Sequence, residues 1–184
     1  MDNLNLAKLY SSAKTDGSFI YVVKPGDSLY NIAKKFNTTI DLIKRMNRLT
    51  SSRIYPEQEL KIIKDPFSIT VHKSTNTLEL FLGERLLKTY RVATGKDDQT
   101  PTGEFDIINK LTNPTWFHAG AIVPPNSPDN ILGTRWMGFD KRGYGIHGTT
   151  IPESIGQHST AGCVRMLNEE VEELDELSKG TLGS

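Results

Sequence analysis

The first regular hydrophobic pattern follows a polar start and predicts a strand and a helix. Residues 1–18 are polar and lack a sustained period, so we expect an N-terminal tail or a frayed helix. Residues 20–23 are β-branched and aromatic, which favours a strand. A Pro-Gly turn then leads to Asp27, which we expect to cap a helix. Apolar residues spaced i, i+3, i+4 and i+7 predict that this helix runs from Ser28 to about Phe36.

A second helix and a closing strand complete this first pattern. Thr38, with Asp41 three residues later, predicts the cap of a helix that carries Ile40, Ile43 and Met46. A turn over residues 53–56 then leads into an apolar strand over residues 60–63. The expected product is a small β-α-α-β module over residues 19–64.

Apolar and polar positions alternate in the rest of the chain, which predicts strands. A Lys-Asp-Pro-Phe linker places a boundary near residue 65. Period-two patterns then predict strands at 69–71, 78–82, 86–93, 104–109, 136–139 and 144–147. Residues 111–133 are rich in Pro, Asn and Gly and predict a long loop that could serve as a lid or binding rim.

A helix is predicted near the end of the chain. Asn168 is its expected cap, and the apolar residues Val171, Leu174 and Leu177 recur every three positions. We expect a further strand after Gly180-Thr181 to close the sheet, and we expect it to be truncated. The fold class predicted for the whole chain is α+β, with a mostly antiparallel β-sandwich or barrel-like domain over residues 65–184.

The two parts of the chain carry opposite net charges, and the overall balance argues against a nucleic-acid partner. The net charge is zero overall, while residues 20–64 carry +5 and residues 65–184 carry −5. We therefore expect no nucleic-acid partner. No run approaches the ~20 apolar residues of a membrane span, and the N-terminus lacks the pattern of a signal peptide. We expect a monomer.

One cysteine and a preceding histidine carry the candidate chemistry. Cys163 follows Ala161-Gly162, and His147 lies between Ile146 and Gly148. A thiol attacks as the thiolate and needs a base, because its ordinary pKa of roughly 8.5 leaves it protonated at pH 7. A zinc site formed by His147, His158 and Cys163 is a weaker alternative, since the ligand spacing is not compact. We therefore expect no metal and no cofactor.

The first module resembles a LysM domain. The resemblance rests on the segment YVVKPGDSLYNIAKKF, on Asn47 to Leu49 and on the closing segment IYPEQELKI. It implies binding of N-acetylglucosamine-containing glycan, as in peptidoglycan. The implied contacts lie in two loops, with residues Gly26, Asp27, Ser28, Ile54, Tyr55 and Pro56. For Pro25, Gly26 and Asp27, each taken singly, ordinary turn and cap chemistry is an equally good interpretation.

The second module resembles the YkuD-type L,D-transpeptidases. The resemblance rests on YGIHGT at residues 144–149, on TAGCVRM at 160–166 with Asn168, and on Gly95 with TPTGEF at 100–105. Where the family often has histidine, this chain has Ala161. The resemblance implies that Cys163 attacks a peptidoglycan tetrapeptide stem, releases D-alanine through a thioester and forms a cross-link. It also implies that carbapenems acylate Cys163.

The same resemblance assigns roles to the residues around the cysteine. His147 is the implied base and the Gly148 carbonyl orients it, while backbone N–H groups at Gly162 and Cys163 stabilise the oxyanion. Arg165 binds a substrate carboxylate or holds the cysteine loop. Further candidates for substrate contact are Thr160, Gly162, Tyr144 and Trp116, although a turn residue suits Thr160 and packing suits the two aromatics.

The activity that follows from these residues has alternatives. Hydrolysis of the thioester by water would make the protein an L,D-carboxypeptidase, and loss of turnover would leave a peptidoglycan-binding protein. The acceptor amine stays open. Both resemblances imply a location in the bacterial cell envelope, in the periplasm or the wall, with an export signal outside this sequence.

Overall fold

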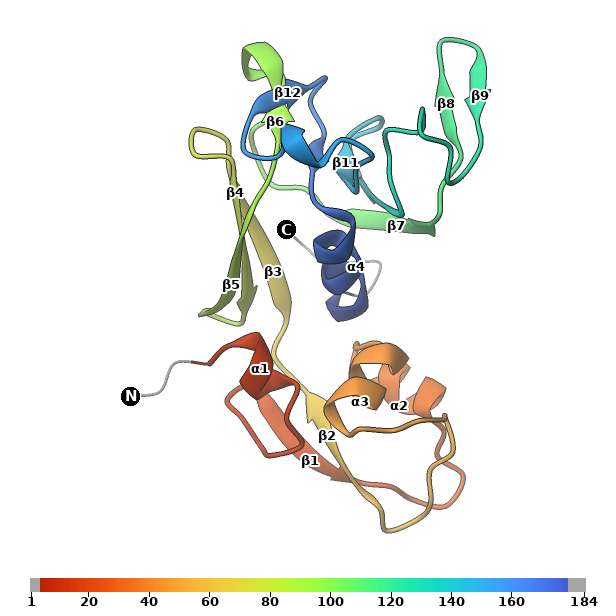
Figure 1. The fold of residues 1–184 in the computed structure, drawn as a ribbon. Helices are drawn as coiled ribbons and strands as arrows, with labels where there is room; N and C mark the ends of the chain where they lie inside the picture. Colours follow the sequence, from red (N-terminus) through yellow and green to blue (C-terminus); the bar gives the residue numbers. More distant parts are fainter. Residues whose placement is uncertain (1–3, 179–184) are drawn as a thin grey trace. The chain divides into compact units, whose positions relative to one another are not determined.

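The computed structural model describes residues 4–178, which divide into two compact units (Figure 1). The first consists mainly of residues 4–68, and the second mainly of 69–79 and 89–175. The helices are α1 (Leu6–Leu9), α2 (Leu29–Lys35), α3 (Ile40–Met46), α4 (Asn168–Leu177) and the 3-10 turns η1 (Lys96–Asp98) and η2 (Pro152–Ser154). The strands are β1 (Ser18–Val22), β2 (Glu59–Ile63), β3 (Phe67–His72), β4 (Thr77–Leu82), β5 (Arg85–Arg91), β6 (Thr94–Gly95), β7 (Ile107–Thr112), β8 (Trp116–His118), β9 (Ala121–Val123), β10 (Arg135–Phe139), β11 (Gly145–His147), β12 (His158–Thr160) and β13 (Val164–Arg165).

The first unit has the predicted β-α-α-β order. Strand β1 pairs antiparallel with β2, from Ser18 opposite Ile63 to Val22 opposite Glu59. The stripe predicted on α2 is buried in a cluster with side chains of α3 and β2. Burying such a stripe stabilises two helices that are too short to persist alone. The cluster consists of Val23, Leu29, Ile32, Ala33, Ile43, Leu60 and Ile62.

Both predicted helix caps in this unit are wrong by one residue. Ser28, not Asp27, caps α2 through a bond from the Asn31 N–H. The Asp27 carboxylate instead accepts from the Lys24 N–H and the Tyr21 hydroxyl.

Thr39, not Thr38, caps α3 by accepting from the Leu42 N–H at 3.0 Å. The physical reason is that the Thr38 N–H still donates to the carbonyl of Ala33, so Thr38 belongs to the end of α2.

The N-terminal segment contains an ordered helix that the sequence pattern understated. Leu6 and Leu9 of α1 are buried, and the ammonium of Lys61 donates to the carbonyls of Leu9 at 2.7 Å and Ser11 at 2.9 Å. Lys61 lies on β2 and is 1% exposed. Burial lowers the pKa of this lysine to about 8. A buried cation thus closes the carbonyl end of α1.

The second unit is mostly antiparallel, with two parallel pairings where the cysteine segment joins. The four-stranded sheet has the order β13-β11-β10-β7, and β10 is antiparallel to both β11 and β7. Strand β11 pairs parallel with β13, and β12 pairs parallel with β6. Strands β3, β4 and β5 form a three-stranded sheet in that order. The α+β class is confirmed, although the strand expected at 104–109 begins at Ile107.

The segment expected to be a loop contains a hairpin. Strands β8 and β9 pair around Ala119-Gly120, both with positive φ, as in the primed turns of short hairpins. Phe117 and Ile122 lie opposite one another and are 72% and 70% exposed. Residues 111–133 therefore contain a paired hairpin and not only a loop, because Ala119-Gly120 supplies its turn.

Helix α4 buries the predicted apolar positions Val171, Leu174 and Leu177. The first bonds within the helix run from the N–H groups of Glu170 and Val171 to the carbonyl of Leu167, and Asn168 is already helical, so the prediction that Asn168 is the cap is wrong. The strand expected after Gly180 lies outside the described residues. Among residues 4–178, the structure contains no helix of the length and apolarity needed to cross a membrane.

Candidate active site

His147 lies at the end of β11, between two neighbouring strands. It is opposite Trp136 of β10 and beside Arg165 of β13. The Trp136 ring is nearly parallel to the imidazole, with 6.0 Å between centroids. His147 is only 2% exposed. Sheet pairing on both sides therefore fixes the backbone from which the imidazole projects.

The next residue in the chain orients the imidazole. His147 Nδ1 lies 2.6 Å from the carbonyl oxygen of Gly148. A carbonyl only accepts, so the proton of the neutral ring is at Nδ1 and the Nε2 lone pair is free. The pKa of His147 is lowered to about 4, mainly by burial, which outweighs the opposing hydrogen bond to Gly148 and is reinforced by the nearby charge of Arg165. The ring is therefore neutral at pH 7.

A tight turn places Cys163. The Thr160 hydroxyl donates to the Cys163 carbonyl at 2.7 Å and accepts from the Gly162 N–H at 3.1 Å. Gly162 has φ of 132°, and a Cβ there would lie 2.6 Å from the Tyr144 ring. Only glycine suits both this backbone angle and this close approach. Thr160 and Tyr144 thus shape the turn that carries the cysteine.

The Cys163 thiol is half-buried, and its Sγ lies 3.5 Å from the carbonyl of Gly143. Burial raises the pKa of Cys163, and a backbone hydrogen bond at Gly145 and the charge of Arg165 oppose this only in part. The resting thiol is therefore protonated at neutral pH. Attack by this sulfur requires a base at the moment of reaction.

One cleft joins most of the predicted site residues. It has a volume of about 430 Å³, and both Cys163 and His147 line it. The hairpin β8–β9 contributes Trp116 and His118, whose rings stack with 4.6 Å between centroids. The other predicted residues on its wall are Thr160 and Arg165. Tyr144 lines a neighbouring hollow instead, together with Gly143.

Arg165 is a buried cation in this cleft. It is 7% exposed, and its backbone exchanges two 2.8 Å hydrogen bonds with Ala93. Its Nη1 donates to the Ser154 hydroxyl at 3.0 Å, while its buried Nε has no hydrogen-bond partner among residues 4–178. Burial lowers the pKa of Arg165. Ser154 was missed in the sequence because its contact is formed only by the folded chain.

Asn168 was also missed as a contributor to the site. Its Oδ1 accepts from the Thr149 N–H at 2.9 Å and from the Thr134 N–H at 3.3 Å. The sequence assigned this residue to a helix cap, which is the commonest use of asparagine before a helix. In the structure its amide reaches the loop that follows His147.

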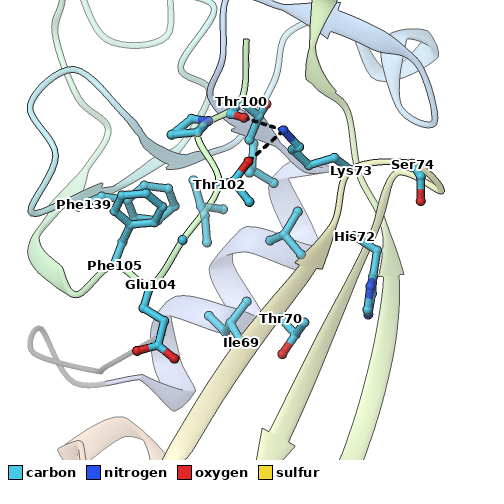
Figure 2. Close-up of a pocket in the computed structure, with 15 residues that line it drawn as sticks. Ile69, Thr70, His72, Lys73, Ser74, Thr100, Thr102, Glu104, Phe105 and Phe139 are labelled. Atoms are coloured by element: carbon cyan, nitrogen blue, oxygen red, sulfur yellow. Dashed lines mark hydrogen bonds between the residues drawn. The ribbon is translucent and has the colours of Figure 1, made fainter. Parts of the chain in front are cut away.

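A second hollow of about 640 Å³, which neither Cys163 nor His147 lines, lies between β3 and residues 100–105 (Figure 2). Ile146 and Val164 line it, whereas their chain neighbours His147 and Cys163 line the cleft. Alternation along a strand explains this division. At the rim, Lys73 donates to the Thr100 carbonyl and the Thr102 hydroxyl, as the dashed lines in Figure 2 show.

The candidate glycan-contact loops of the first unit lie at one end of its sheet. Val23 exchanges bonds with Glu57 and Gln58, which brings the turn after Tyr55 beside the turn that contains Gly26. Tyr55 is exposed and a Cβ on Gly26 would meet nothing within 4 Å. Pro56 is exposed, Ser28 caps α2, and Ile54 packs on the core. The turn that contains Gly26 and the turn after Tyr55 therefore form one accessible surface.

The alternative zinc site is not formed by the described residues. Across residues 4–178, no group of three His, Cys, Asp or Glu side chains is placed to hold a metal ion. His158 Nε2 lies 2.8 Å from the carbonyl of Lys73. His158 is not part of the cleft wall.

Comparison with known families and proteins agrees with both modules. Residues 66–181 match the YkuD family, the L,D-transpeptidase catalytic domain, and residues 21–62 match the LysM domain. The Bacillus subtilis protein named "Putative L,D-transpeptidase YkuD" is 38% identical over 161 residues, which cover 84% of this chain and 90% of that protein. "Putative L,D-transpeptidase YqjB" of the same species is 45% identical over 126 residues, covering 65% and 70%.

A solved structure with low sequence identity supports the fold. The catalytic domain of an E. faecium L,D-transpeptidase, acylated by ertapenem, superposes with a TM-score of 0.51 at 22% identity. The match covers 65% of this chain and 95% of that domain. The chain therefore belongs to the YkuD family of L,D-transpeptidases and carries an N-terminal LysM domain.

Proposed function

We propose that this protein is a peptidoglycan L,D-transpeptidase with Cys163 as its nucleophile. The observation that carries the proposal is the shared cleft: a cysteine and an oriented neutral histidine line the same cleft in a chain of this family. Cys163 Sγ attacks the carbonyl that follows the L-centre of a tetrapeptide stem. The bond to the terminal D-alanine breaks and a thioester remains. An amine of a second stem then displaces the sulfur and forms the 3-3 cross-link.

The proton moves during attack rather than before it. Burial raises the pKa of Cys163 and lowers that of His147, so the pair rests as thiol and neutral imidazole. As the sulfur–carbon bond forms, His147 Nε2 takes the thiol proton and then gives it to the departing amine. The Gly148 carbonyl stabilises the transient imidazolium through Nδ1–H. This arrangement needs no acidic third residue.

The remaining cleft residues bind and orient the substrate in this proposal. Because the Gly162 N–H is already bonded to Thr160, we assign the oxyanion contact to the Cys163 N–H. Arg165 lines the same cleft as a cation, which suits an anionic substrate. Trp116 offers an aromatic surface on the hairpin. Thr160 acts through the turn, and Gly162 and Tyr144 give that turn its shape.

The LysM module, which we place at residues 19–64 ahead of a catalytic domain at 65–184, binds N-acetylglucosamine-containing wall glycan. The two loops around Gly26 and Tyr55 form an accessible surface for such a ligand. A weak tether of this kind raises the local concentration of stem peptides. Peptidoglycan as the partner of both modules places the protein in the bacterial cell envelope, in the periplasm or the wall.

The test is mass spectrometry of the protein mixed with a tetrapeptide-bearing muropeptide. We expect release of D-alanine and an acyl adduct on Cys163, with a cross-linked product when an acceptor stem is present. The Cys163→Ala variant should give none of these. Release of D-alanine without a cross-link would favour L,D-carboxypeptidase activity. Wall binding with no adduct on the folded wild-type protein would favour a non-catalytic binding protein.

Carbapenems provide a second probe of the same thiol. They present a strained carbonyl, and the fold relative from E. faecium is described as acylated by ertapenem. We expect ertapenem to add its mass to the wild-type protein and not to Cys163→Ala. An unmodified wild-type mass after long incubation would contradict the assignment of Cys163 as a nucleophile.

A further inference from the structure

Asn168 makes two contacts that a helix cap would not make. It is the first residue of α4, yet its Oδ1 accepts from the N–H groups of Thr149 and Thr134. These two residues flank the paired ends of β11 and β10, where His147 lies opposite Trp136. One carboxamide oxygen therefore joins the two strand ends just beyond the imidazole.

The contact with Thr149 acts on the peptide unit that His147 uses. The Thr149 N–H and the Gly148 carbonyl belong to the same planar peptide group and point in opposite directions. On one side the N–H donates to Asn168 Oδ1 at 2.9 Å, and on the other the carbonyl lies 2.6 Å from His147 Nδ1. Holding the N–H thus fixes the direction of the carbonyl.

Two glycines make room for this contact. A Cβ on Gly148 would lie 2.1 Å from Asn168 Oδ1, and a Cβ on Gly133 would lie 2.3 Å from it. Both distances are far below any real contact, so the carboxamide fits only between residues without side chains. The backbone at Gly133 and Gly148 therefore closely surrounds the Asn168 side chain.

We propose that Asn168 is a positioning residue for catalysis, which holds the Gly148–Thr149 peptide so that its carbonyl fixes the Nδ1–H tautomer of His147. The chain of contacts runs from Asn168 through one peptide unit to the imidazole, whose Nε2 is then free to accept the Cys163 proton. Hydrogen bonds in such a chain polarise one another. The Gly148 carbonyl takes the orienting place that an acidic residue has in Ser-His-Asp triads, and Asn168 holds that carbonyl in position.

The inference rests on the proposed function, because it concerns how His147 serves Cys163. It differs from a purely structural role in what it changes. Loss of a helix-end contact would lower stability alone, whereas loss of this contact frees the Gly148 carbonyl and lets the ring proton move to Nε2. The tautomer of His147 is therefore the property to measure.

The experiment compares three variants of the whole chain. Asn168→Ala removes the acceptor, Asn168→Asp keeps it, and Glu169→Ala changes an exposed neighbour in the same turn of α4 as a control. For each, the rate of Cys163 acylation by ertapenem is followed by mass spectrometry across pH. Nitrogen NMR of the His147 ring reports which nitrogen carries the proton.

We expect Asn168→Ala to acylate about 10- to 100-fold more slowly, as is typical when the partner that orients a functional histidine is removed. Its ring should lose the dominant Nδ1–H form. Asn168→Asp should stay within a few-fold of wild type and hold that form, and Glu169→Ala should match wild type in both.

The inference is overturned if folded Asn168→Ala keeps both the rate and the tautomer of wild type, or if Glu169→Ala slows as much. If Asn168→Ala does not fold, the Asn168→Asp variant decides. Slow acylation of Cys163 and a mixed His147 tautomer in Asn168→Asp would also overturn the inference. A wild-type protein that ertapenem never acylates would refute the proposed function instead. The NMR comparison would still decide whether Asn168 fixes the ring.

Discussion

The molecule buries a titratable nitrogen in each of its two units, and the two differ in what surrounds them. Lys61 of the LysM module donates to carbonyls at the end of α1 and does not line the cleft that holds Cys163. His147 of the catalytic domain has one nitrogen bonded to Gly148, while the other is free beside a cleft that also holds a thiol. Burial lowers the pKa of both groups.

The difference shows how structural and chemical uses of a buried nitrogen can be separated. A buried donor whose bonds are all satisfied within the protein holds two segments together. A buried group that has an unused hydrogen-bonding position facing a cleft can bind a ligand or exchange a proton with a reacting atom. Burial and a shifted pKa therefore do not distinguish a structural nitrogen from a chemically active one. An unused hydrogen-bonding position that faces a cleft does.

The sharpest test on the catalytic side is removal of the proposed base, His147. His147→Gln should slow acylation of Cys163 by about 10²- to 10⁴-fold, the usual contribution of a general base. The rate is measured by mass spectrometry with ertapenem. The variant should show a circular dichroism spectrum like that of wild type. A rate within a few-fold of wild type would show that His147 is not the base.

The matching test on the structural side is the pH dependence of stability. The pKa of Lys61 is about 8 when folded and 10.5 in its ordinary state, so the unfolded chain binds more protons between these values. The free energy of unfolding should therefore rise as pH rises from 8 to 10.5, by up to about 3 kcal/mol. Denaturant titrations across this range measure it.

The Lys61→Met variant serves as the control for this pH effect. It lacks the titrating group, so its free energy of unfolding should follow the wild-type curve without this rise. The same rise in both proteins would assign the effect to another group. Acylation of Cys163 should be unchanged, since Lys61 is not part of the cleft.

A smaller effect is expected at the aromatic rim of the cleft. Trp116→Ala should raise KM for a tetrapeptide donor about tenfold while kcat changes little, because it removes contact area rather than a reacting group. Steady-state release of D-alanine measures both constants. Ile122→Ala, on the same hairpin but not on the wall of the cleft, is the control. Equal effects of the two changes would indicate a loss of the hairpin instead.

The smallest effect is expected in the LysM module. Tyr55→Ala should weaken sedimentation with purified cell walls several-fold, since the glycan surface supplies only a few contacts. Acylation by ertapenem in solution should be the same as for wild type. If wall binding is unaffected, the loop containing Tyr55 is not part of the glycan surface.

The sequence determined the parts that depend on local pattern. The i, i+3, i+4, i+7 stripe after Ser28 predicted α2 and its buried face. The period-two alternation predicted β3, β4, β5, β7, β10 and β11, but not the short strands β6, β8, β9, β12 and β13. The motifs around His147 and Cys163 named the family that the comparisons show. These features need only neighbours in the chain, so they can be read without a structure.

The tertiary structure decided which partner each polar side chain takes. Asn168 looks like a helix cap in sequence, yet its oxygen bonds to Thr134 and Thr149, which are distant in the chain. Lys61 looks like a surface residue of a strand, yet it closes the end of α1. A hydrogen bond depends on which groups the folded chain brings within about 3 Å, and no pattern of neighbouring residues contains that distance.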